Sequence, residues 1–153
     1  MGEAVVVIGV GNPDRGDDGV GPAVVSRAKG CLPESARPVC LFGDDPAAIM
    51  DAWRGAQRAV VVDAMVSGAR PGTVRRFRAS TEPLPEEVGL ASTHALGAGA
   101  AIEMARVLGR LPARLTLYGV EAVGFTVGSG LSPAVAAAVP AVVEQVLEEV
   151  ADA

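Results

Sequence analysis

Residues 5–22 read VVVIGVGNPDRGDDGVGP, and the prediction of the fold starts here. The run from Val5 to Ile8 is β-branched throughout and leaves no polar face, which is typical of a parallel strand covered on both sides. Gly9 and Gly11 then allow a close backbone approach or a positive φ, and Pro13 prevents the strand from continuing. The stretch therefore predicts a buried strand, a tight loop and the start of a helix.

Asp17 and Asp18 lie in this loop, immediately before the predicted helix. A short acidic side chain accepts hydrogen bonds from free N–H groups at the positive end of a helix, so either aspartate is predicted to act as the cap. Asp18 beside this helix end is also expected to stay ionised and to offer oxygen to a metal ion. Two interpretations stay open: caps that solubilise the turn, or ligands of a cation.

A dinucleotide-binding loop is the first alternative for glycines that follow a strand. That motif needs Gly-x-Gly-x-x-Gly leading directly into a helix whose N-terminus holds pyrophosphate. Here the third glycine comes late, at Gly16, and two carboxylates occupy the place of the phosphate. Because carboxylates repel an anion, no nucleotide is expected as a ligand.

Length and composition predict one folded domain over residues 1–153, without a linker or an internal repeat. The net charge of -5 argues against a nucleic-acid partner, whose phosphates would need clustered Lys and Arg. No segment approaches the ~18 apolar residues of a membrane span, and Glu3 stands where a signal peptide carries positive charge. We therefore expect a cytoplasmic protein without a membrane partner. Cys31 and Cys40 match neither a redox nor a zinc spacing and are expected to be ordinary thiols.

Residues 59–65, AVVVDAM, form a second buried-strand pattern, and this one contains an acid near its end. A carboxylate at the carboxyl end of a parallel strand lies where open α/β sheets place their ligands. Burying an unpaired ion costs several kcal/mol, so a cation or strong hydrogen-bond donors are expected near Asp63. The alternative is an aspartate that only accepts hydrogen bonds from loop N–H groups.

His94 is the only histidine in the chain. It lies close to a predicted helix start, where Ser92 or Thr93 is expected to be the cap. The positive end of a helix favours the neutral imidazole, which is the form that binds metal ions. A metal ligand and a packing or capping residue are both compatible with this position.

Buried-strand and helical patterns alternate along the chain, which predicts an α/β fold. The expected architecture is a three-layer α/β/α sandwich around a mostly parallel, twisted sheet of five strands. Arginines in the pattern at 73–77 suit one antiparallel edge strand. Asp44 and Asp45 precede a helix beginning at Pro46 and fit either a cap or a metal ligand. Pro140 is expected to kink or break the C-terminal helix.

Taken together, these glycines, acids and the histidine resemble a known family. The matching motifs cover nearly the whole chain and are GVGN at 9–12, GDDGVGP at 16–22, VDA at 62–64, PG at 71–72, TH at 93–94, GVE at 119–121 and GLSP at 130–133. In this order they are similar to the maturation endopeptidases of nickel–iron hydrogenases, which also implies a phosphorylase/hydrolase-like sheet. The chain departs from the family at Asp45-Pro46, where one branch has Pro-Glu, and at Ala122, where many members have Pro; both are expected to affect substrate choice.

The resemblance implies a metal-recognising site made of Asp18, Asp63 and His94. It also implies cleavage of a short C-terminal extension from the hydrogenase large-subunit precursor after nickel insertion, an aspartic-type or metal-assisted hydrolysis that activates the hydrogenase. Two carboxylates and one imidazole form an incomplete shell, suited to nickel but also to zinc or cadmium. We expect the nickel to arrive bound to the substrate and to determine which peptide bond reaches the cleft. Asp18 and Asp63 are the candidates for the catalytic residues.

Two hypotheses from other classes stay open beside this one. The first is a metal-dependent peptidase or a germination-protease-like hydrolase that acts on an unrelated substrate. The second is a non-catalytic protein that binds the nickel-loaded precursor without cutting it.

Overall fold

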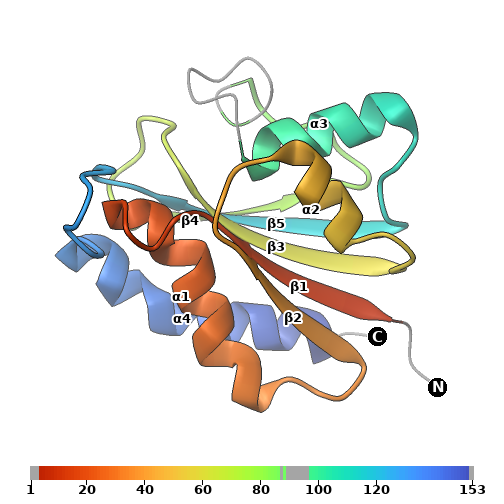
Figure 1. Cartoon of the computed structure of the whole chain (residues 1–153), viewed down its shortest axis with the longest axis horizontal. Helices are drawn as coiled ribbons and strands as arrows, with labels where there is room; N and C mark the ends of the chain where they lie inside the picture. The colour runs from red at the N-terminus through yellow and green to blue at the C-terminus, as the bar shows by residue number, and fades with distance from the viewer. Residues whose placement is uncertain (1–3, 87, 89–96, 152–153) are drawn as a thin grey trace.

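The computed structural model describes residues 4–86, 88 and 97–151 of the chain (Figure 1). In this part of the chain, five strands form one sheet in the order β2-β1-β3-β5-β4, and among them only β4 runs antiparallel to its neighbour. The predicted three-layer sandwich with one antiparallel edge strand is therefore confirmed. The strands are β1 (Val5–Val10), β2 (Ala36–Leu41), β3 (Arg58–Met65), β4 (Val74–Arg78) and β5 (Arg114–Glu121).

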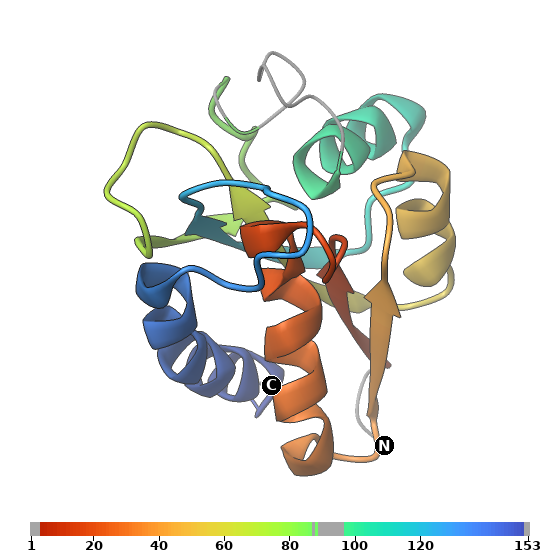
Figure 2. The same ribbon diagram turned by 60° about the vertical axis from the view of Figure 1, so that its left-hand side comes forward.

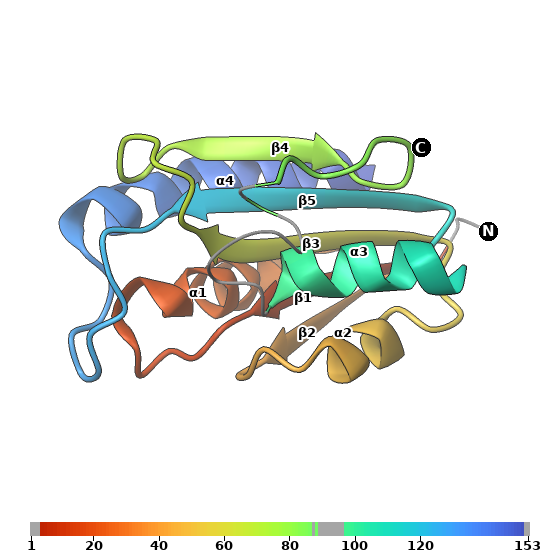
Figure 3. The ribbon, with the colours of Figure 1, turned by 90° about the horizontal axis from the view of Figure 1, so that it is seen from above.

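Within the described residues, four helices cover the two faces of the sheet: α1 and α4 pack on one face, and α2 and α3 on the other (Figures 1 and 3). They are α1 (Val20–Ala28), α2 (Pro46–Ala52), α3 (Ala98–Leu108) and α4 (Pro133–Ala151). Short 3₁₀ turns, η1 (Gly16–Gly19) and η2 (Lys29–Cys31), precede and follow α1.

Strand β1 shows why the apolar run at the start of the chain has no polar face. Val5 and Val7 belong to the core under α1 and α4, whereas Val6 and Ile8 belong to the core under α2 and α3. Successive residues of a strand point to opposite faces, so a strand covered on both sides needs apolar residues at every position.

Helix α4 is continuous through Pro140, so Pro140 does not break it, and the kink, the other expected outcome, stays a prediction. A proline inside a helix costs about 3 kcal/mol because it removes one backbone hydrogen bond and crowds the preceding turn. Buried valines on both sides of it, Val135 and Val139 before and Val142 and Val146 after, pack against the sheet and α1. We infer that their burial offsets the cost of the proline.

The C-terminal turn of α4 is tied to the sheet through Glu149, which is 8% exposed. Its Oε1 accepts hydrogen bonds from Arg76 Nε and from Tyr118 Oη, each at 2.8 Å. Arg58, at the start of β3, donates to the backbone carbonyls of Glu149 and Val150. Burial alone would raise the pKa of Glu149, but the hydrogen bonds from Arg76 and Tyr118 outweigh it and lower the pKa.

Glu149→Gln is expected to lower the free energy of unfolding at pH 7 by about 2 kcal/mol, because it removes the charge from two hydrogen bonds. A carboxylate whose pKa is lowered on folding stabilises the fold above its unfolded pKa, and this contribution is lost as the pH falls through the folded value. The difference from the wild type should therefore shrink in acid. Urea unfolding at pH 7 and in mild acid would measure it, with Glu148→Gln, an exposed neighbour, as control.

The two outer strands of the sheet are β2 and β4. Strand β2 carries the exposed Arg37 and, next to it, Pro38, which lies opposite Val7. Strand β4 carries the exposed Arg76 and Arg78. The predicted arginine-bearing edge strand is thus confirmed.

No helix in the described part of the chain is both long enough and apolar enough to cross a bilayer. Cys31 and Cys40 are free, as expected from their spacing.

Candidate active site

The loops that follow β1 and β3 meet at the carboxyl edge of the sheet. After β1 the chain continues into β2 on one side, and β3 lies on the other side. Open α/β sheets bind their ligands in the crevice where the strand order reverses in this way. Asp18 follows β1 and Asp63 lies near the end of β3, so both acids predicted from the sequence lie at this point.

Neither aspartate of the first loop caps α1, so that prediction is wrong. The residues 16–19 form the separate turn η1, and the N-cap of α1 is Gly19, without a side-chain hydrogen bond. The turn places both carboxylates ahead of the helix, and each accepts hydrogen bonds from elsewhere.

Asp18 is held by the loop in which it lies. Its Oδ2 accepts a hydrogen bond from the backbone N–H of Asn12 at 2.9 Å, and its own N–H donates to the carbonyl of Arg15. Gly11 has φ +136°, and a Cβ there would overlap the carbonyl of Asp18. The loop therefore requires glycine at position 11 to fold back on itself. Asp18 is then half-buried at the carboxyl edge of the sheet.

Asp17 has a different role and is 1% exposed. It accepts four hydrogen bonds: from Val123 N at 2.7 Å, Gly124 N at 3.4 Å, Ser132 N at 2.7 Å and Ser132 Oγ at 2.9 Å. Burial alone would raise its pKa, but these donors outweigh it and lower the pKa. Asp17 thus joins η1 to both ends of the segment between β5 and α4, which passes beside η1 in Figure 2.

Asp63 meets the start of α3 at the same edge. Its Oδ2 accepts a hydrogen bond from Ala98 N at 3.0 Å, and its Oδ1 accepts from Ala64 N at 2.8 Å. Gly97, the N-cap of α3, has φ +95°, and a Cβ there would lie 2.9 Å from Oδ2 of Asp63. The expectation of donors near Asp63 is confirmed, and the backbone before α3 is brought against the carboxylate.

The pKa of Asp63 is raised to about 7. Burial is the largest cause; the hydrogen bond from Ala98 opposes it, and the negative charges of Asp18 and Asp44 add to it. Three carboxylates therefore share one region of the surface and act on each other. A site of this kind favours a cation over an anion, which agrees with the exclusion of a nucleotide.

The second acidic pair divides into two roles. Asp45 is the N-cap of α2, and its Oδ1 accepts a hydrogen bond from Ala47 N at 2.9 Å. The carbonyl of Asp44 accepts from Gly97 N at 3.3 Å, which places Asp44 beside the start of α3. The capping interpretation is therefore confirmed for Asp45, and Asp44 belongs to the surroundings of Asp63.

His94, with the predicted caps Ser92 and Thr93, lies outside the described residues. Among residues 4–86, 88 and 97–151, no group of three or more His, Cys, Asp or Glu is arranged to hold a metal ion. The metal-recognising triad therefore stays a prediction. Two of its three members, Asp18 and Asp63, lie at the same edge of the sheet. The N-cap of α3 is Gly97 rather than Ser92 or Thr93.

The family of the chain follows from comparison with known proteins. A family model described as hydrogenase maturation protease matches residues 39–149. The chain belongs to this family. It is also 31% identical over 137 residues to the hydrogenase expression/formation protein HupD of Rhodobacter capsulatus. That match covers 88% of the chain and 65% of HupD, so the chain spans less than two thirds of this curated relative.

Solved structures of the family have the same fold. The hydrogenase maturating endopeptidase HybD from E. coli superimposes with a TM-score of 0.77 at 28% identity, over 97% of this chain and 92% of HybD. The maturation protease HybD from Thermococcus kodakarensis gives 0.68 at 26% identity, over 95% and 98%. The resemblance expected from the sequence motifs is therefore confirmed: the chain belongs to the hydrogenase maturation protease family and has its fold.

Two further carboxylates shape this edge of the sheet, and the roles that they have in the structure were not predicted from the sequence. One is Asp17, which was predicted as a cap or a cation ligand and instead accepts hydrogen bonds from the segment between β5 and α4. The other is Glu121, which is 2% exposed at the end of β5. Its carboxylate accepts hydrogen bonds from the N–H and the hydroxyl of Ser67 and so fixes the segment after β3. An acid directly after an apolar strand is the signal that would have drawn attention to Glu121.

Proposed function

We propose that this protein is an endopeptidase that removes a short C-terminal extension from the nickel-loaded large-subunit precursor of a nickel–iron hydrogenase. The observation that carries the proposal is the half-buried Asp63 at the point of strand reversal, with Asp18 and Asp44 close enough to raise its pKa. Membership of the maturation protease family supports the substrate class. The cytoplasmic location expected from the sequence belongs to the same proposal.

Asp18, Asp63 and His94 are proposed to recognise the nickel that the precursor carries. Carboxylate oxygen and imidazole nitrogen suit nickel, and they also accept zinc or cadmium. His94 precedes Gly97 by three residues, and a chain of that length reaches at most about 11 Å. Since Gly97 lies against the carboxylate of Asp63, this reach is compatible with a shared site.

Hydrolysis then needs a group that receives a proton or a group that polarises the scissile carbonyl. Asp63 is suited to receive a proton, because a pKa near 7 lets a carboxylate exchange protons at neutral pH. Asp18 lies on the adjoining turn and adds negative charge. We propose that the two aspartates are the catalytic pair, and that the metal in the substrate fixes which peptide bond reaches them.

The test is to incubate the protein with nickel-loaded and with nickel-free precursor and to weigh the products by mass spectrometry. We expect a loss of mass from the nickel-loaded precursor alone, and no loss with His94→Ala, which should retain the wild-type unfolding temperature. Equal cleavage of both precursors would contradict metal recognition and favour a peptidase of broader substrate range. Nickel-dependent binding without any loss of mass would instead identify a non-catalytic binder.

A further inference from the structure

Exposed apolar side chains gather at the same edge as the carboxylates. The described residues expose seven large apolar side chains, and four of them follow strands β2, β3 and β5 at this edge: Phe42, Val66, Val123 and Val127. The other three, Met104, Val107 and Leu108, lie on α3. Single exposed apolar residues are ordinary, but several around one site indicate a surface that another molecule covers.

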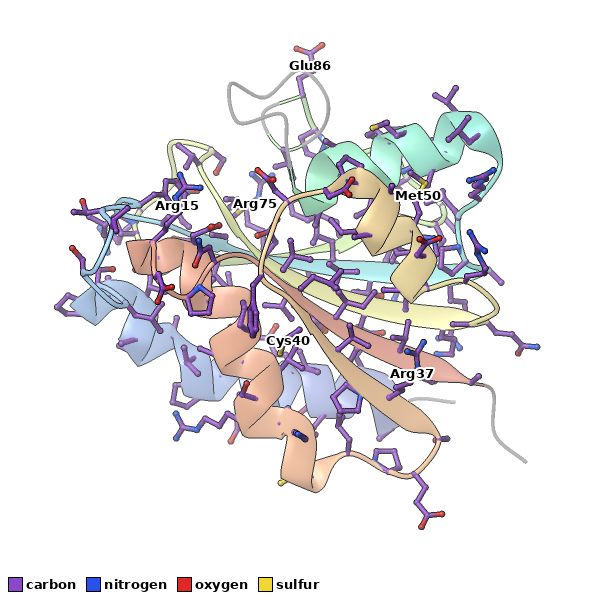
Figure 4. All side chains as sticks on the ribbon, in the orientation of Figure 1. Arg15, Arg37, Cys40, Met50, Arg75 and Glu86 are labelled. Atoms are coloured by element: carbon purple, nitrogen blue, oxygen red, sulfur yellow. The ribbon has the colours of Figure 1, made fainter. Side chains whose placement is uncertain are left out.

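Val123 and Val127 belong to the β5–α4 loop (residues 122–132), which hydrogen bonds hold against the loop of Asp18. Val123 N donates to Asp17, and Gly128 N donates to the carbonyl of Asp14 at 2.7 Å. Val127 also pairs with Arg15 in an antiparallel bridge. Arg15 lies at the end of the molecule where α1 begins (Figure 4), so the two valines border the turn that carries Asp18.

We propose that Val123 and Val127 form an apolar wall that binds an apolar stretch of the substrate polypeptide beside the bond to be cut. This inference rests on the proposed function and adds a determinant of substrate choice to it. The wall is fixed by hydrogen bonds to Asp17, the immediate neighbour of Asp18, so it adjoins the turn that carries Asp18.

The charges at this edge also limit what the wall can bind. Asp18, Asp44 and Asp63 repel an acidic segment, whereas an uncharged apolar segment meets no such repulsion. Val123 is 62% exposed and Val127 76% exposed, so both have apolar surface left to bury. Because Asp17 already holds the loop in place, little conformational entropy is lost when a substrate binds.

The experiment compares the double variant Val123→Ser/Val127→Ser with Val107→Ser, using cleavage of the nickel-loaded precursor. Val107 is a matched control, because it is a valine, 82% exposed, on α3. We expect the KM of the double variant to rise about tenfold, the effect of losing part of the burial of two valines. Its kcat should not change, because the lost contact binds ground state and transition state alike. Val107→Ser should match the wild type.

A second measurement separates binding from cleavage. Asp63→Asn protein carrying the same two serines should bind the nickel-loaded precursor about tenfold more weakly than Asp63→Asn alone. An unchanged KM and an unchanged affinity would overturn the apolar wall while the endopeptidase activity stands. If the wild-type protein does not cut the precursor, the proposed function fails and this inference fails with it.

Discussion

Asp63→Asn is expected to slow precursor cleavage about a hundredfold or more, the usual loss when a catalytic acid or base is removed. The substitution keeps the shape of the side chain but removes the charge and the proton-accepting oxygen. It should leave the fold intact, because relief of repulsion from Asp18 and Asp44 offsets the loss of one hydrogen bond from Ala64 or Ala98. Single-turnover cleavage assays followed by mass spectrometry would measure the effect.

The stability of this variant provides an internal check. A group whose pKa is raised from 3.8 to about 7 on folding destabilises the folded state increasingly as the pH rises through that interval. The unfolding temperature of Asp63→Asn, relative to the wild type, should therefore be higher at pH 8 than at pH 5. Asp51→Asn, an exposed aspartate on α2, is the control and should change neither property. Full activity of Asp63→Asn would exclude Asp63 as a catalytic residue.

Asp17→Ala is expected to have the largest effect on stability, lowering the free energy of unfolding by about 3 kcal/mol or more. The substitution removes the buried carboxylate that accepts hydrogen bonds from the backbone N–H groups of Val123, Gly124 and Ser132 and from the Ser132 hydroxyl. The β5–α4 loop should then detach from η1, and hydrogen exchange at Val123 and Ser132 should accelerate. Urea unfolding and amide exchange would measure both effects.

Asp14→Ala is the matched control, since Asp14 is an exposed aspartate three residues earlier in the same loop. It should unfold at the wild-type urea concentration. If Asp17→Ala were as stable as Asp14→Ala, the hydrogen bonds of Asp17 would not be what holds the β5–α4 loop.

The strands could be predicted from the sequence because their apolar runs leave few other structures open. Val5 to Ile8 and Val60 to Val62 are apolar at every position, and short β-branched runs of this kind are typical of strands covered on both faces. Asp63 could be predicted as a site residue for the same reason, since a carboxylate interrupts one of these runs near its carboxyl end. The position of Asp63 near the carboxyl end of a buried strand was thus enough to predict that it belongs to the site.

The separate roles of Asp17 and Asp18 could not be predicted. Two adjacent aspartates look alike in a sequence, and the donors that Asp17 uses lie 106 to 115 positions away. The cap prediction failed because η1 inserts a turn before α1, and local propensity does not reveal a turn that is stabilised by distant contacts. The break considered at Pro140 does not occur for a related reason, since packing around α4 outweighs the local cost of a proline.

The two outer strands bear on how the protein behaves in concentrated solution. A sheet with open edges can recruit a strand from a second molecule and grow into an aggregate. Here a copy that added to β4 would bring its charged Arg76 and Arg78 near those of this chain, and Pro38 on β2 has no backbone N–H to donate. Addition of a strand from a second copy is therefore opposed at both edges of the sheet.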